Sequence, residues 1–163
     1  MSAIESDELP CLLIPLDGAQ LLLPNVVVAE VLRSQRLRSA AGLPACCVGH
    51  FLWRGAVLPL LSFEVANGGR AAPPAALGDG VLVMNRTRDL AGIGFYGLIT
   101  RGTPRLVRLA AEDLDEVVST GQPRAELGRV ILGAEEAVIP DLAQLEDLIL
   151  EYRLMAPSAG ATV

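Results

Sequence analysis

The sequence contains no lysine, so its 13 basic residues are all arginines, and 19 acidic residues leave a net charge of −6. Nucleic-acid binding depends on the neutralisation of phosphates, so this balance argues against a nucleic-acid partner. His50 is the single histidine. A transition-metal site or a histidine-dependent catalytic site would have to rely on it alone. We therefore expect no metal, no cofactor and no enzymatic activity.

Cysteine is also scarce, with Cys11, Cys46 and Cys47 only. The number is odd, and a disulfide between two adjacent cysteines would be strained. No CxxC motif occurs. Free thiols in a reducing compartment are the simplest interpretation.

The sequence has no long uninterrupted apolar run and no basic N-terminal leader. Residues 1–10 carry three acidic side chains, which is unlike a signal peptide. The apolar run Phe51 to Phe63 is interrupted by Arg54 and Pro59, and it is too short to span a bilayer. We expect a cytoplasmic protein without direct membrane insertion.

Apolar residues, by contrast, are abundant: they make up 52% of the 163 residues, against about 45–50% in an ordinary globular domain. A single chain of this length has difficulty hiding so many apolar side chains. The excess predicts either a generous core or an apolar surface reserved for partners.

Short apolar segments separated by turn signals predict hairpins of β-strands. Arg54-Gly55 separates two such segments, and we expect the charged segment Arg86 to Asp89 to form the turn of another hairpin. Strands do not alternate with long helices, so a parallel α/β sheet is not expected. Ala110 to Val118 has a helical pattern, as does Asp141 to Tyr152, where leucines recur at helical spacing behind a possible N-cap, Asp141.

The chain is expected to form one folded region over residues 9–152. An internal boundary is expected near residues 66–80, where glycine, proline and alanine accumulate. Residues 1–8 and 156–163 are expected to be flexible termini.

Gly92, Gly94 and Gly97 form a GxGxxG pattern. In a dinucleotide site this pattern lies between a strand and a helix. Here Leu98-Ile99-Thr100 follows, which favours a strand. We interpret these glycines as residues that ease the curvature of a barrel strand.

Glu30 and Arg54 are charges within or at the end of strongly apolar segments. Burial of an isolated charge is costly, so one interpretation is a mutual Glu30–Arg54 ion pair. The alternative is that both side chains point outward from strand ends.

Three stretches resemble the CheW-like domain, the coupling protein of bacterial chemosensory arrays. They are Gly18, Leu23-Pro24 and Val28-Ala29-Glu30-Val31-Leu32-Arg33; Leu43-Pro44, Val48-Gly49 and Phe51-Leu52-Trp53-Arg54-Gly55-Ala56-Val57-Leu58-Pro59-Leu60-Leu61; and the closing hairpin from Leu127-Gly128-Arg129 to Leu132 with its C-terminal helix.

The resemblance covers about Leu9 to Tyr152, and the first half matches better than the second. Ser62 stands where the family usually has Asp, and Gly94 to Ile99 lacks the Asp of the family pattern. The resemblance implies an all-β fold with short helices, in which two SH3-like β-barrel subdomains pack together.

The resemblance also implies a non-enzymatic scaffold between a CheA-type histidine kinase and the cytoplasmic tip of a methyl-accepting chemoreceptor. The pathway would be chemotaxis or the type IV pilus pathway of twitching motility. It places Val28, Gly49 and Arg54 on the receptor-facing surface, and it favours the Glu30–Arg54 pair. Partner-binding residues are therefore expected at Val28, Glu30, Gly49, Trp53 and Arg54.

A different class of function remains open, in which a β-barrel binds a small molecule through its glycine-rich strand and pocket aromatics. The low stock of polar side chains argues against it, because small-molecule sites need a few convergent polar groups.

Overall fold

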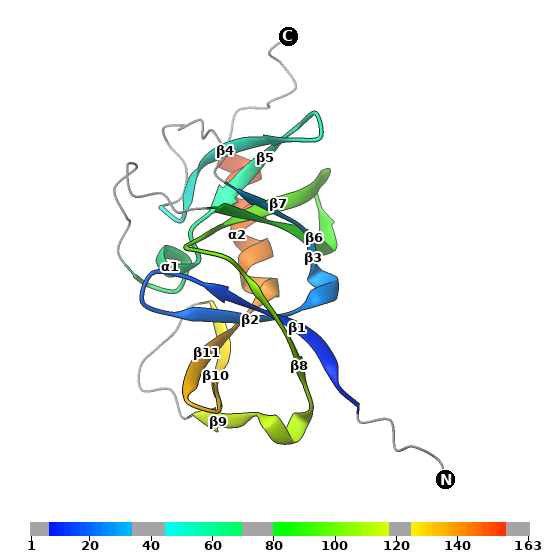
Figure 1. The fold of residues 1–163 in the computed structure, drawn as a ribbon. Coiled ribbons are helices and arrows are strands. Elements are labelled where there is room, and N and C mark those ends of the chain that lie inside the picture. The colour runs from blue at the N-terminus through cyan, green and yellow to red at the C-terminus, as the bar shows by residue number, and fades with distance from the viewer. Residues whose placement is uncertain (1–6, 34–44, 70–79, 118–124, 156–163) are drawn as a thin grey trace.

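The computed structural model describes residues 7–33, 45–69, 80–117 and 125–155, except the side chains of residues 154 and 155. Its strands form two antiparallel-rich sheets, each curled around its own core (Figure 1). The six-stranded sheet has the order β8-β1-β2-β11-β10-β9 and the five-stranded sheet the order β3-β6-β7-β5-β4. The prediction of an all-β protein built from two packed β subdomains is confirmed.

The six-stranded sheet is built from both ends of the folded chain, and the five-stranded sheet from the segment between them. The first contains β1 (Leu9–Pro15), β2 (Gln20–Pro24), β8 (Arg105–Leu109), β9 (Asp115–Val117), β10 (Glu126–Leu132) and β11 (Glu135–Pro140). The second contains β3 (Val28–Arg33), β4 (Cys47–Trp53), β5 (Ala56–Leu61), β6 (Gly80–Leu90) and β7 (Ile93–Thr100). The helices are η1 (Asn25–Val27), α1 (Phe63–Ala66), η3 (Ala111–Asp113) and α2 (Leu142–Met155).

The chain changes sheets between β2 and β3 and again between β7 and β8. The internal boundary expected near residues 66–80 does not coincide with either point. That segment connects β5 and α1 to β6, and both strands belong to the five-stranded sheet. Its central residues, 70–79, lie outside the described part of the chain, as do 1–6 and 156–163 of the two expected flexible termini.

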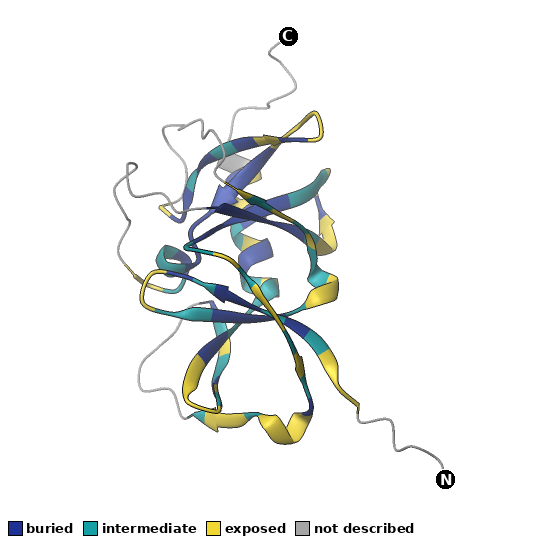
Figure 2. Ribbon diagram, in the orientation of Figure 1, coloured by how far each residue is buried: buried dark blue, intermediate teal, exposed yellow. Residues whose placement is uncertain are grey.

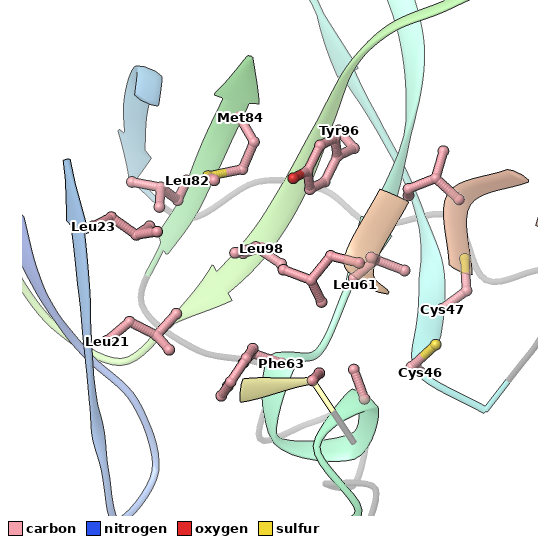
Figure 3. Packing of buried hydrophobic residues seen from close by; sticks show 14 of the residues in the cluster. Leu21, Leu23, Cys46, Cys47, Leu61, Phe63, Leu82, Met84, Tyr96 and Leu98 are labelled. Atoms are coloured by element: carbon pink, nitrogen blue, oxygen red, sulfur yellow. The ribbon is translucent and has the colours of Figure 1, made fainter. Parts of the chain in front are cut away.

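Alternating side chains of the same strand enter different cores. Val81 and Val83 of β6 enter the interior of the five-stranded sheet, whereas Leu82 and Met84 face a larger core between the two sheets. Leu21 and the other inward residues of β2 reach that core from the opposite side (Figure 3). Residues 21–23 of β2 and 80–84 of β6 are therefore buried on both faces of their strands, which explains their continuous apolar sequences.

Helix α2 joins the two sheets through this shared core. It begins directly after β11, where the Asp141 carboxylate accepts a hydrogen bond from the backbone N–H of Gln144 at 3.2 Å, as expected for an N-cap. Leu145 and Ile149 are fully buried in the core between the sheets. At the other end, Tyr152 forms a hydrogen bond with His50 of β4. The helix predicted from leucine spacing is confirmed.

Two predicted elements were wrong. The segment Arg86 to Asp89 is part of strand β6, and the turn lies at Ala91-Gly92, where both φ angles are positive (56° and 92°). The strand continues because Thr87 donates backbone and hydroxyl hydrogen bonds to the Glu146 carboxylate of α2. Contacts with a distant helix therefore overrode a local charge pattern.

Of the helix expected over residues 110–118, the described residues 110–117 form no α-helix. A single 3-10 turn, Ala111–Asp113, is closed by the Asp113 carboxylate, which accepts a hydrogen bond from the Ala110 backbone N–H at 2.8 Å. Strand β9 follows and pairs antiparallel with β10. The pairing with β10 satisfies backbone groups that a helix would have satisfied locally.

Candidate partner-binding site

The β4–β5 hairpin positions two of the residues expected to bind partners. Its two-residue turn, Arg54-Gly55, has positive φ at both positions (47° and 79°). Turns of this kind match the twist of the flanking strands and hold a hairpin in one register. Trp53 pairs with Ala56 directly before the turn. Trp53 is buried, whereas Arg54 is exposed. The tip of the β4–β5 hairpin is an exposed part of the molecule (Figure 2).

Glu30 reaches the same place from β3, the opposite edge of the five-stranded sheet. The pairing of β3 with β6 shifts between Val28 and Glu30, as in a β-bulge, a feature that often re-aims a side chain. The Trp53 indole Nε1–H donates a hydrogen bond of 2.7 Å to Glu30 Oε2. This bond connects the two edge strands, so it closes the sheet on itself.

Arg54 completes what we term the Glu30–Trp53–Arg54 cluster. Its Cζ atom lies 4.6 Å from the Trp53 ring centroid, and its Nη2 lies 3.4 Å from Glu30 Oε2. Phe95 packs edge-to-face against the Trp53 ring, with 4.7 Å between the two ring centroids. The Arg54 side chain is 70% exposed. An ion pair this exposed contributes at most about 1 kcal/mol, so the Trp53–Glu30 hydrogen bond is the stronger link.

The guanidinium of Arg54 is held in place by contacts with Trp53 and Glu30, but only one of its nitrogen atoms donates a hydrogen bond to a described residue. Among the described residues, Glu30 is its only hydrogen-bond partner, through Nη2. The cation–π contact limits the rotamers of a side chain that would otherwise be mobile. The cluster therefore presents guanidinium N–H groups in a defined position, ready for a carboxylate or carbonyl of a partner.

The other two expected residues lie nearby along the same strands. Val28 begins β3 and packs, half-buried, against the core between the sheets. Gly49 is a buried residue of β4, with φ of 145°, at a register shift between Cys47 and Gly49. The structure brings Glu30, Trp53 and Arg54 into contact, whereas Val28 packs against a different core from the one that contains Trp53.

Leu52 and Val57 were missed by the sequence reasoning. They are cross-strand partners on the outer face of the hairpin and are 60% and 53% exposed. A signal was available, because an inward Phe51 and Trp53 place Leu52 on the outer face of the same strand. An exposed apolar pair therefore lies beside the charged tip.

A groove of about 470 Å³ lies where the chain passes from the five-stranded to the six-stranded sheet. Val31 and Arg33, on the outer face of β3, form one wall, and the segment from Thr100 to Pro104 forms another. Thr100 is 1% exposed, and its hydroxyl has no hydrogen-bond partner among the described residues. The groove thus combines apolar and charged side chains, with the buried Thr100 hydroxyl at the end of strand β7.

Gly97 and Cys47 lie at packed positions of the structure. Gly97 lies in strand β7, where a Cβ atom would come within 2.5 Å of Phe51 Cε1, so the glycine permits close packing. Cys47 is buried between the sheets, and desolvation raises the pKa of its thiol to about 11. In the part of the chain that the structure describes, no group of three or more His, Cys, Asp or Glu residues could hold a metal ion.

The family model of the CheW-like domain matches residues 10–148. The chain belongs to the CheW-like domain family. No curated protein sequence matches it. Among solved structures, the CheW-like chain is similar to the scaffolding protein TtCheW from Thermoanaerobacter tengcongensis. The TM-score is 0.66 at 12% sequence identity, over 82% of this chain and 88% of that one. This match confirms the predicted CheW-like fold of two SH3-like subdomains. In the described ranges, no helix is long and apolar enough to cross a membrane.

Proposed function

We propose that this CheW-like protein is a non-enzymatic scaffold that couples chemoreceptors to a CheA-type histidine kinase in bacterial chemosensory signalling. Family membership over residues 10–148 supports this proposal, as does the scaffolding role stated for the similar protein TtCheW. The pathway is chemotaxis or the control of type IV pili in twitching motility. The protein would act in the cytoplasm and be recruited to receptor arrays.

The observation that carries the proposal is the pre-organised Glu30–Trp53–Arg54 cluster beside the exposed Leu52–Val57 pair. Tryptophan and arginine are enriched among the residues that dominate binding energy at protein interfaces. An aromatic-stacked guanidinium next to apolar surface supplies both direction and buried area. We propose that partner contacts are made here, with Val28 and Gly49 shaping the strands that present the cluster.

A coupling protein has to hold two partners at the same time, which requires two separate surfaces. The groove at the junction of the sheets supplies a second surface, since its lining shares no residue with the cluster. Its exposed Val31 supplies apolar surface for a partner. Strand β3 contributes to both surfaces through its opposite faces.

Affinity measurements with the kinase regulatory domain and the receptor cytoplasmic fragment encoded near this gene test the proposal. Arg54→Ala should weaken binding of at least one partner by about tenfold or more, while the melting temperature changes little. Arg86→Ala is the matched control, because Arg86 is also an exposed arginine in a single weak ion pair. Failure of the native protein to bind either partner at micromolar concentration would contradict the scaffold. Equal losses for both variants would contradict the role of the cluster.

A further inference from the structure

A third surface lies at one end of the six-stranded subdomain, away from both surfaces described above. A cavity of about 350 Å³ opens there between the start of β1, the end of β8, η3 and β11. It shares no lining residue with the junction groove or with the Glu30–Trp53–Arg54 cluster. The exposed rim formed by η3 and β9 is visible in Figure 2.

The walls of this cavity are almost entirely apolar. Leucines from three strands and from the η3 connection face it, and the buried Cys11 contributes a thiol. The principal wall residues are Leu9, Leu22, Leu109, Leu114 and Ile139. Leu9 is 48% exposed. Apolar walls left open to solvent in this way are typical of a surface that receives a partner.

The rim of the cavity is acidic. Asp7 lines its mouth, and Glu8 follows directly before β1. On the other side, Glu112, Asp115 and Glu116 are exposed in η3 and β9. Two described basic residues lie on the neighbouring strands. Arg108 is exposed on β8 opposite Pro10, and Arg129 of β10, opposite Val117 of β9, is ion-paired with Glu126 and Glu136. The rim therefore complements a positively charged partner, because unlike charges around an interface favour encounter and orientation.

The chemistry of the cavity selects the kind of occupant. A small-molecule site needs convergent polar groups that orient the ligand, whereas the polar side chain here is a single carboxylate at the mouth. An apolar hollow surrounded by a polar rim is the architecture that receives an anchor side chain of a protein partner. We propose that this cavity is the docking site of a protein segment that inserts one large apolar side chain flanked by basic residues. The inference goes beyond the scaffold function proposed above and does not depend on it.

The proposal can be tested with a fluorescein-labelled nonapeptide that has one central phenylalanine flanked on each side by arginine and lysine. Fluorescence anisotropy should detect saturable binding with a Kd below about 1 mM, weakening as salt rises. Replacement of the phenylalanine by alanine, or of the basic residues by glutamates, should weaken binding by about tenfold or more. Methyl chemical-shift changes in the NMR spectrum should be confined to the cavity leucines and Ile139.

Variants of the protein locate the peptide. Ala111→Trp should block the mouth and reduce affinity at least about tenfold, whereas Ala29→Trp, at an exposed strand position of the other subdomain, should not. Asp7→Asn combined with Glu112→Gln should reduce affinity several-fold without altering the walls. Asp89→Asn is the control for this double variant.

Several outcomes would overturn the proposal. These are no binding below 1 mM, equal or tighter binding of the glutamate peptide, or shift changes outside the cavity. The apolar anion anilinonaphthalenesulfonate provides a further test. If it binds in the cavity as tightly as the basic phenylalanine peptide, the cavity is a site for apolar small molecules instead. If Ala111→Trp fails to fold, the charge variants decide the question by themselves.

Discussion

The interiors of the two subdomains are filled by side chains of different size. The interior of the five-stranded subdomain holds Phe51 and Trp53, with Phe95 packed against them. The described interior of the six-stranded subdomain contains no aromatic residue and consists of Cys11, Leu13, Leu22, Val130 and Ala137. The first is so full that Gly97 cannot accommodate a Cβ. The second retains the open cavity of about 350 Å³.

The subdomains also differ in how their edge strands are joined. In the five-stranded sheet the edges β3 and β4 are far apart in sequence, and the Trp53–Glu30 hydrogen bond connects them. In the six-stranded sheet the edges β8 and β9 are consecutive strands, connected by the short η3 segment. One closure depends on side chains and the other on the chain itself. The comparison teaches that substitutions can open the first subdomain more easily than the second.

The largest effect should come from emptying the aromatic interior. Phe51→Ala is expected to lower the free energy of unfolding by about 3–5 kcal/mol, because it leaves a closed void. Leu22→Ala should fall near the lower end of the usual range, about 2 kcal/mol, since its void merges with an existing open cavity. Urea denaturation measures both values. Equal losses would remove the packing difference between the subdomains.

Overfilling the same interior should have the next largest effect. A Cβ at Gly97 would lie 2.5 Å from Phe51 Cε1 and 2.9 Å from Leu60 Cδ1. Gly97→Ala is therefore expected to cost about 1–3 kcal/mol. Gly94→Ala is the matched control in the same strand, because nothing lies within 4 Å of its Cβ position. A stable Gly97→Ala protein would indicate that the interior has spare room.

Removal of the Trp53–Glu30 hydrogen bond between the edge strands should lower the free energy of unfolding by less, about 1 kcal/mol. Trp53→Phe retains the ring but removes the indole donor, and Glu30→Gln retains an acceptor without the charge. A double-mutant cycle on unfolding free energy should show coupling between positions 30 and 53 that exceeds the coupling between 30 and 54. Stronger coupling of Glu30 to Arg54 would assign the closure to the ion pair.

The smallest effect concerns the reactivity of the cysteine thiols. Because Cys11 lines the open cavity, we expect its thiol to be the most accessible of the three. Cys11 lines the cavity, whereas Cys46 and Cys47 lie between the sheets, and burial raises the pKa of all three thiols. At pH 8 all three should react slowly with a thiol reagent, with Cys11 reacting first. Mass spectrometry of the labelled protein identifies the order. Earlier labelling of Cys46 would contradict the open cavity.

The same pKa shift has a consequence for stability at alkaline pH. Cys47 ionises near pH 9.0 when unfolded and near 11 when folded. Between these values the unfolded chain loses a proton that the folded chain retains, so stability falls as pH rises. Cys47→Ala should flatten this part of the pH dependence of unfolding.

Parts of this architecture could be predicted from neighbouring residues alone. Asp141 and the leucine spacing behind it determine α2, because cap and periodicity are local properties. Arg54-Gly55 marked its hairpin for the same reason. Residues 86–89 were predicted wrongly, as were the described residues 110–117 of the helix expected over 110–118. In each segment a distant partner, helix α2 or strand β10, supplied the hydrogen bonds that decided the conformation.

The sequence by itself determined that the chain is a β-rich, acidic protein, since composition and local periodicity carry that information. Its motifs also resembled those of the CheW-like domain. It also drew attention to Glu30 and Arg54 as charges in apolar surroundings. Only the tertiary structure revealed that Trp53 is the closest partner of Glu30, that one subdomain is full and the other hollow, and that the acidic η3–β9 segment borders the hollow. The packing of an interior and the hydrogen-bond partner of a side chain depend on which segments lie next to each other in space. Neighbouring residues in the sequence do not determine this.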